Sequence, residues 1–271
     1  MKNSLERRFL VKPGSKVKLS KFDPDDTAGA KGRGQCEATL QKNVEHLFEQ
    51  QSLLAASNQH AVLVVLQGMD AGGKDGTIRH VMTGLNPQAC RVTSFKVPSD
   101  EERRHGFLWR VHNAVPRRGE IGIFNRSHYE DVLVTRVHKL VPKPVWSARY
   151  DQINEFEKIL AGNQVIILKF FLHISKGEQK RRLEQRLADP TRYWKFSLHD
   201  VEERGYWSGY RKAYEAALSR CSTKWAPWHV VPANKKWYRN LVVAETVVRT
   251  LRDLDMEYPP PSIDISKVKI E

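Results

Sequence analysis

Residues 68 to 74, GMDAGGK, have the types and spacing of a phosphate-binding loop. Gly68 is followed by four residues, and Gly73 and Lys74 come next. Glycine adopts backbone angles that residues with a Cβ avoid, so consecutive N–H groups can turn toward one anion. Lys74 adds a positive charge, and a helix beginning there adds the positive end of its dipole. The pattern predicts phosphate binding; the alternative is a glycine-rich turn without a ligand.

The residue after Lys74 departs from the usual loop. Ser or Thr normally follows, and its hydroxyl holds Mg²⁺; here Asp75 follows, then Gly76 and Thr77. Asp70, inside the loop, would be repelled by bound phosphates unless a cation lay between them. We therefore expect Asp70 to bind Mg²⁺ (or Mn²⁺) in place of the missing hydroxyl, and we do not expect an ordinary ATPase or GTPase.

A second group of candidate residues follows a short apolar stretch at 120–124. In phosphoryl-transfer enzymes an acidic residue that orients Mg²⁺ usually lies there, whereas this chain has Asn125, which still offers an oxygen. Arg126 can make paired hydrogen bonds to a phosphate. Glu130 can restore the missing charge or contact a substrate. The alternatives are a loop or helix cap for Asn125 and an exposed helix-start carboxylate for Glu130.

A basic segment at 176–186 is the third candidate. Lys176 and Lys180 are four residues apart, as are Arg182 and Arg186, so each pair shares a face of a predicted helix. One interpretation is a lid that brings positive charge to transferring phosphates, for which the planar guanidinium is suited. The other is a lattice of salt bridges with the acidic residues among them.

These residues need a scaffold that brings them together. Apolar runs predict strands at residues 61–66, 91–97, 120–124, 164–172 and 225–231. Helical periodicity and capping residues predict helices at 36–56, 74–84, 99–115, 147–160, 176–189, 197–219 and 236–256, with N-caps at Ser147 and Ser175. This alternation predicts an α/β fold with a central parallel sheet, helices on both faces and ligands at the carboxyl ends of the strands.

Size and composition narrow the class of protein. The chain has 271 residues and a formal net charge of +14, enough for one large domain and indicative of an acidic partner or substrate. Nucleic acid, a membrane surface, a phosphate compound or merely a basic surface all fit that charge. Residues 1–35 read as an irregular basic arm and 36–271 as a single domain. Three widely spaced cysteines, no signal-like start and no long apolar run predict a cytoplasmic protein without a membrane span.

Four collinear segments make the chain resemble the polyphosphate kinases of the second type. They are GMDAGGKDGTIRHV, FNRSHYEDVLV, SKGEQKRRLEQRLADPTRYWKFS and APWHVVPANKKWYRN. Asn125 in the second segment is similar to the third class of that family, which is associated with phosphorylating both AMP and ADP. The resemblance implies a P-loop kinase-like three-layer fold with a helical lid at about 175–200. It also implies Mg²⁺-dependent, reversible transfer from polyphosphate to AMP or ADP, and homo-oligomers, either dimers or tetramers.

The resemblance also assigns roles. Asp70 would hold the metal, with Asn125 as a weaker candidate; Lys74, Arg126 and Arg186 would contact transferring phosphates; Glu130 would support AMP acceptance or the metal. A basic channel for the polymer would include Arg103, Arg104, Arg117, Arg118, Lys176, Lys180 and Arg182. The predicted phosphate-binding set is Gly68, Gly72, Gly73, Lys74, Asp75, Gly76, Thr77, Arg79, Lys180 and Arg182.

Two rival functions stay open. One is a nucleoside-monophosphate kinase that uses ATP as donor. The other is a nucleic-acid-binding protein, suggested by the charge and by Trp207, Tyr210 and Tyr214. Stacking platforms need exposed aromatic rings, and rings on helices are more often part of a core. We therefore expect polyphosphate and the adenine nucleotides AMP, ADP and ATP as ligands, and neither nucleic acid nor a membrane.

Overall fold

Five parallel strands form the centre of the protein in the computed structural model, which describes residues 5–30 and 32–270. The strand order is β2-β3-β1-β4-β5, and each neighbouring pair is parallel. The predicted parallel sheet is therefore confirmed. The strands are β1 (Ala61–Gln67), β2 (Cys90–Ser94), β3 (Ile121–Asn125), β4 (Val165–His173) and β5 (Trp228–Pro232).

Strand β1 lies in the middle of the sheet, and every one of its residues is buried. An apolar run suits this position because helices shield both faces. The chain leaves β1 toward β2 on one side and leaves β4 toward β5 on the other. Connections that diverge from adjacent strands leave a crevice at their carboxyl ends, where open α/β sheets bind ligands.

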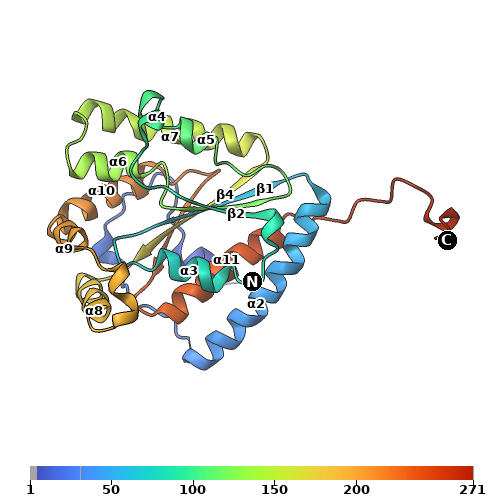
Figure 1. Ribbon diagram of the computed structural model, residues 1–271, viewed down its shortest axis with the longest axis horizontal. Coiled ribbons are helices and arrows are strands. Elements are labelled where there is room, and N and C mark those ends of the chain that lie inside the picture. Colours follow the sequence, from blue (N-terminus) through green and yellow to red (C-terminus); the bar gives the residue numbers. More distant parts are fainter. Residues whose placement is uncertain (1–4, 31, 271) are drawn as a thin grey trace.

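Helices cover both faces of the sheet, as predicted (Figure 1). Helices α2, α3 and α11 pack together on one face, and α6, α7 and α10 pack together on the other. Their bounds are α2 (Arg33–Ser57), α3 (Lys74–Val81), α6 (Glu130–Val137), α7 (Lys143–Gly162), α10 (Trp207–Arg220) and α11 (Lys236–Arg252).

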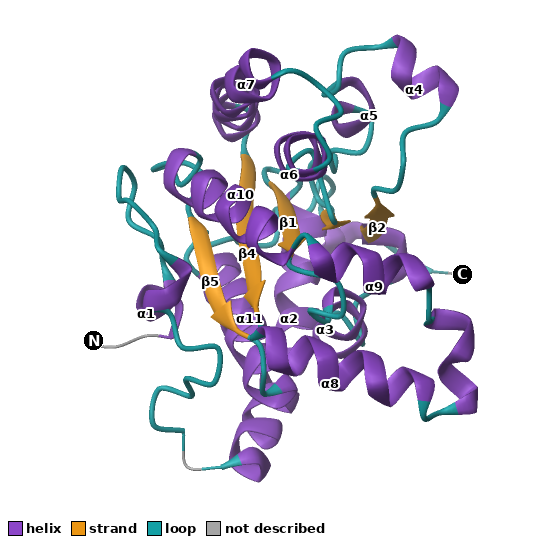
Figure 2. Cartoon of the chain, turned by 90° about the vertical axis from the view of Figure 1, so that its left-hand side faces the viewer, coloured by secondary structure: helices purple, strands orange, loops and turns teal. Residues whose placement is uncertain are grey.

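The segment predicted as a lid lies beyond the carboxyl ends of the strands. It contains α8 (Lys176–Leu187), a 3-10 turn (Pro190–Lys195) and α9 (Leu198–Gly205). Helix α8 begins beside the tips of the β4 and β5 arrows (Figure 2). The lid candidate therefore borders the edge of the sheet where the predicted site residues should gather.

Two predicted helices are broken. Instead of one helix at 99–115, the chain forms α4 (Asp100–Arg104) and α5 (Trp109–His112), because His105 is extended and Gly106 follows. Instead of one helix at 197–219, α9 and α10 meet at Tyr206, whose ψ of 10° lies outside the helical range. Both breaks follow a glycine or an extended residue that helical periodicity alone does not detect.

The two predicted N-caps have different outcomes. Ser175 caps α8, since its Oγ accepts a hydrogen bond from the N–H of Glu178 at 3.1 Å. The prediction for Ser147 is wrong, because α7 begins four residues earlier, at Lys143. Pro144 in the first turn explains the earlier start, since the fixed φ of proline suits that turn and its missing N–H costs nothing there.

The amino-terminal arm packs along the β5 edge of the sheet. It contains α1 (Leu5–Phe9), and the side chains of Phe9, Val11 and Leu19 are buried. The N–H of Val11 donates to the carbonyl of Trp228 at 2.8 Å. The arm therefore covers backbone groups that an edge strand would otherwise expose.

In the described part of the chain, no helix is both long and apolar enough to cross a membrane. All three cysteines carry free thiols. Cys36 and Cys221 are buried, and Cys90 is partly buried.

Candidate functional site

The loop that follows β1 has the backbone of an anion-binding turn. Ala71 and Gly73 have φ values of 59° and 100°, in the left-handed region. A Cβ on Gly72 would lie 2.7 Å from the carbonyl oxygen of Met69, and one on Gly73 would lie 2.0 Å from Nη1 of Arg239. Helix α3 begins at Lys74, so the positive end of its dipole faces the loop. Glycine is therefore required at both positions.

Lys74 lies inside a group of charged side chains. Its Nζ donates to the carbonyl of Gly68 at 2.8 Å. Burial and the charge of Arg126 lower the pKa of Lys74, while three carboxylates oppose that shift; these are Asp70, Glu130 and Asp75. The structure thus brings together five predicted residues from the loops after β1 and β3.

Arg126 and Asn125 connect these two loops. Nη2 of Arg126 lies 3.0 Å from Oδ1 of Asp70. Nδ2 of Asn125 donates to Oδ1 of Asp75 at 2.6 Å. Both contacts cross from the β3 loop to the phosphate-loop region, so they fix the spacing between the two groups of candidates.

Glu130 begins α6 and is partly buried at this junction. Burial raises the pKa of Glu130, although the charges of Arg126 and Lys74 offset part of that rise. A carboxylate held in a partly desolvated position beside two cations is suited to contact a polar ligand rather than to cap a helix in solvent.

The carboxylates around the loop are the candidate ligands for a metal ion. No group of three or more His, Cys, Asp and Glu side chains in residues 5–30 and 32–270 is arranged around a common metal position. Mg²⁺ needs only one or two protein carboxylates when substrate phosphates and waters complete its shell. Asp70, partly exposed beside the loop, fits that sparse donor set. Binding of Mg²⁺ (or Mn²⁺) by Asp70, with Asn125 as the weaker candidate, stays a prediction.

Arg182 lies behind the loop instead of above it. Its side chain is buried and makes five hydrogen bonds within the protein. The acceptors are the carboxylate of Glu178 and the carbonyls of Ala71, Gly72, Ala233 and Asn234. This geometry favours support of the loop over a direct phosphate contact, and direct contact stays a prediction.

The other basic residues of α8 differ in their surroundings. Lys180 is exposed and lies 3.6 Å from Glu184, which matches the predicted salt-bridge lattice. Nη1 of Arg186 lies 2.9 Å from Oδ2 of Asp200 on α9. Arg186 is therefore the lid arginine whose guanidinium lies at the junction of α8 and α9.

The remaining predicted phosphate contacts are spread along α3. Thr77 is buried, and its Oγ1 donates to the carbonyl of Gly73 at 3.1 Å, inside the helix. Gly76 packs against Arg239, because a Cβ there would lie 3.4 Å from Nη2 of that residue. Arg79 is exposed. Of the three, Arg79 is therefore the one whose side chain faces solvent.

Sequence reasoning missed several residues beside this site. Burial and the charge of Asp70 raise the pKa of Asp200, which places this carboxylate near the loop. Arg239 on α11 is buried against Gly73, and burial together with the charge of Arg182 lowers its pKa to about 9. Asp200 lies in a polar helix and Arg239 in the first turn of α11, and in neither place does the sequence pattern distinguish the residue from a surface charge.

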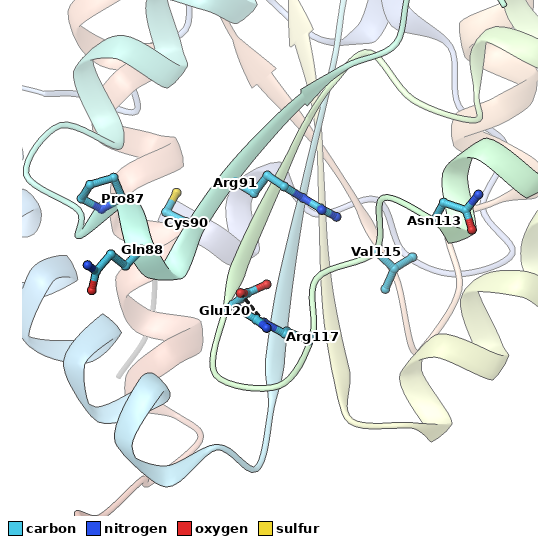
Figure 3. A pocket seen from close by; sticks show the side chains of 8 residues that line it. All are labelled: Pro87, Gln88, Cys90, Arg91, Asn113, Val115, Arg117 and Glu120. Atoms are coloured by element: carbon cyan, nitrogen blue, oxygen red, sulfur yellow. Dashed lines mark hydrogen bonds and ion pairs between the residues drawn. The ribbon is translucent and has the colours of Figure 1, made fainter.

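A cavity of about 510 Å³ lies elsewhere (Figure 3). Cys90 and Glu120, at the amino ends of β2 and β3, are among its lining residues. Arg117 lines this cavity, and both Arg117 and Arg118 line an adjoining hollow of about 370 Å³. These arginines lie near the amino ends of the strands, whereas the phosphate loop follows the carboxyl end of β1. Their role as walls of a channel for the polymer stays a prediction.

Comparison with known proteins gives consistent matches. A family model described as polyphosphate kinase 2 (PPK2) matches residues 31–259. The AMP/ADP-polyphosphate phosphotransferase of Meiothermus ruber is 53% identical over 269 residues, which cover 98% of this chain and 100% of the relative. The ADP-polyphosphate phosphotransferase of Rhodopseudomonas palustris is 45% identical over 265 residues, covering 93% and 92%.

A solved structure is similar along most of the chain. The crystal structure of polyphosphate kinase 2 from Arthrobacter aurescens TC1 superposes with a TM-score of 0.94 at 41% sequence identity. The match covers 97% of this chain and 94% of that chain. The similarity therefore includes the arm, the sheet and the lid segment.

Arg182→Met is expected to destabilise the protein by about 3–5 kcal/mol, because it leaves Glu178 and four loop carbonyls short of a buried donor. Guanidinium denaturation measures this change. Lys180→Met, an exposed position on the same helix, is the control and should change stability by less than about 0.5 kcal/mol. Equal effects of the two substitutions would contradict the supporting role of Arg182.

Glu130→Gln is expected to stabilise the protein at neutral pH. Burial raises the pKa of Glu130 above its ordinary value of 4.5, so ionising this carboxyl lowers folding stability as pH rises above that value. The glutamine variant lacks this cost, and its advantage should shrink toward pH 4. Denaturation curves of both proteins at several pH values test the sign; a variant less stable than wild type at pH 7.5 would refute it.

Proposed function

Because the chain belongs to the polyphosphate kinase 2 family, we propose that it transfers the terminal phosphoryl group of inorganic polyphosphate to AMP and ADP, reversibly forming ADP and ATP. The observation that carries this proposal is the convergence of Lys74, Arg126 and Glu130 on the loop between β1 and α3. The names of the two curated relatives, both phosphotransferases that use polyphosphate, support the same donor and acceptors.

The transfer needs little proton chemistry, because the attacking phosphate oxygen of the acceptor is already anionic. Catalysis then rests on alignment of donor and acceptor and on neutralisation of charge. The loop N–H groups, Lys74 and Arg126 hold the transferred phosphoryl group, and Arg186 adds charge from the lid. Mg²⁺ (or Mn²⁺), held by Asp70, would neutralise phosphate oxygens when bound. Glu130 is assigned to acceptance of AMP or to support of the metal.

A cluster of positive charge beside the loop is suited to hold the polymer. Partial burial, Arg182 and Arg239 lower the pKa of Lys236, and Arg181 and Arg192 add to that shift. Cations that repel one another in this way are stabilised by an anion placed among them. We assign the chain of polyphosphate beyond its reacting end to the exposed members of this cluster, Lys236, Arg181 and Arg192, together with Arg79. The buried Arg182 and Arg239 add positive charge from behind the loop.

The rival functions have weaker support. Tyr214 is buried, and Trp207 and Tyr210 pack against the core, so these rings do not form an exposed stacking platform for nucleic acid. The use of ATP as sole phosphoryl donor has no observation in its favour beyond the phosphate loop itself. Assembly into a dimer or tetramer and a cytoplasmic location stay predictions.

The donor is tested directly. Wild-type protein supplied with polyphosphate, Mg²⁺ and AMP or ADP, without ATP added, is expected to accumulate ADP or ATP, as chromatography would measure. Lys74→Ala should lower turnover by about 10²–10³-fold, since it removes one preorganised charge from the transferring group, while circular dichroism shows a folded protein. Product formation from ATP and AMP alone, with none from polyphosphate, would overturn the proposal.

The basic cluster has its own test. Lys236→Ala should raise the KM for polyphosphate and leave kcat nearly unchanged, because the contact is remote from the reacting end. The slope of log affinity against log salt concentration should also fall by roughly one, by analogy with counterion release from nucleic acids. Lys158→Ala, on α7 at the other face of the sheet, is the control. An unchanged KM for polyphosphate in Lys236→Ala would contradict this assignment.

A further inference from the structure

A buried polar cluster lies beneath the β3 loop; we call it the Lys169 cluster, after the lysine in the middle of β4. Nζ of Lys169 donates three hydrogen bonds, to Oη of Tyr129 at 2.8 Å, Oε2 of Glu157 at 2.6 Å and the carbonyl of Cys221 at 2.7 Å. Both Lys169 and Glu157 are fully buried. A buried ion pair of this kind is tolerated only when its hydrogen bonds are well satisfied.

Glu157 gathers the other members of the cluster. Its Oε1 accepts from Oη of Tyr129 at 2.9 Å and from Nε2 of His128 at 3.2 Å. Burial by itself would raise the pKa of Glu157, but the charge of Lys169 and the bond from His128 bring it below its ordinary value. The carboxylate therefore stays ionised and holds both donors.

The cluster is joined to the site through three consecutive residues. Ser127, His128 and Tyr129 are all buried. Ser127 accepts from Nε2 of Gln67, the last residue of β1, at 3.1 Å, while His128 and Tyr129 bind Glu157. Arg126 and Glu130 flank this anchored triplet directly in the chain, and both are turned to the charged site around Lys74.

Arg126 needs such an anchor. Its φ of 64° lies in the left-handed region, which a non-glycine residue occupies only when its surroundings enforce it. Its N–H donates to the carbonyl of Leu66 at 3.1 Å and its guanidinium contacts Asp70. The anchored triplet fixes the residues that follow Arg126 directly in the chain. An aliphatic pair at positions 157 and 169 would fill the space without directing Tyr129 and His128.

We propose that Lys169 and Glu157, acting through Tyr129 and His128, are positioning residues that hold Arg126 and Glu130 in the geometry needed for phosphoryl transfer. This inference rests on the proposed function. None of the four residues touches the reacting groups. Their role is to fix the backbone that carries Arg126 and Glu130. A displacement of about 1 Å in such a group is sufficient to lower turnover severely.

Tyr129→Phe is the first test. It removes the hydroxyl that joins Lys169 and Glu157 but keeps the ring, which packs edge-on against Trp228 at 4.7 Å between centroids. We expect kcat for ATP formation from ADP and polyphosphate to fall about tenfold. Tyr150→Phe is the matched control, because Tyr150 is also fully buried and its hydroxyl bonds to Arg136 rather than to the cluster. It should leave kcat unchanged.

A double-mutant cycle separates positioning from a general structural effect. If Tyr129 acts largely through Arg126, Tyr129→Phe should lower kcat much less in an Arg126→Lys background than in the wild type. We expect a loss of at most about threefold there, which is the part of the effect that acts through Glu130. The shift in guanidinium unfolding midpoint caused by Tyr129→Phe should be the same in both backgrounds.

An equal loss of kcat in both backgrounds, or no loss in either, would overturn the positioning role. Absence of polyphosphate-dependent activity in the wild-type protein would instead refute the proposed function, so the two failures are distinguishable.

Discussion

A loop that turns its N–H groups toward an anion must turn its carbonyl groups away, and those carbonyls need donors of their own. Here the donors come from the protein interior. Lys74 donates to the carbonyl of Gly68, and Gln179 donates to the carbonyl of Asp70. Arg182 donates to the carbonyls of both Ala71 and Gly72. The first half of α8 is consequently committed to the back of the loop, and much of the surrounding architecture follows from that requirement.

The need for donors to the loop carbonyls also explains why two arginines of α8 have different roles. Arg182, in the middle of α8, is used as a scaffold, whereas Arg186, one turn later, lies where α8 meets α9. The carboxylate of Asp200 forms an ion pair with Arg186. Burial and the nearby charge of Asp70 raise the pKa of Asp200. Carboxylates thus lie next to the arginines around the loop: Asp70 contacts Arg126, and Asp200 contacts Arg186.

The sequence was sufficient to predict the central strand, the tight turn after it and the start of α3 at Lys74. These features depend on local pattern: an apolar run, glycines at fixed spacing and a lysine at a helix start. The sequence was not sufficient where the role of a residue depends on how a helix packs against the loop or the sheet. Arg182 and Arg186 are four residues apart on one helix, so helical periodicity does not distinguish them. Only the structure shows that Arg182 supports the loop by bonding to its carbonyls. Lys169 is a charged residue in the middle of a largely apolar strand. Its partner Glu157 belongs to a helix, and packing decides which face of that helix is buried. The break after Arg104, where His105 is extended, is likewise absent from the helical periodicity.

The two margins of the sheet are unlike, and this has a geometric consequence. The arm closes the β5 side by bonding to Trp228 and bridging His229, whereas no described strand lies beyond β2. Any association of two molecules by lateral strand addition is therefore confined to one margin. If two molecules paired their β2 strands across a twofold axis, neither molecule would have a second free edge strand. Pairing of this kind would stop at a dimer and could not extend into a fibre.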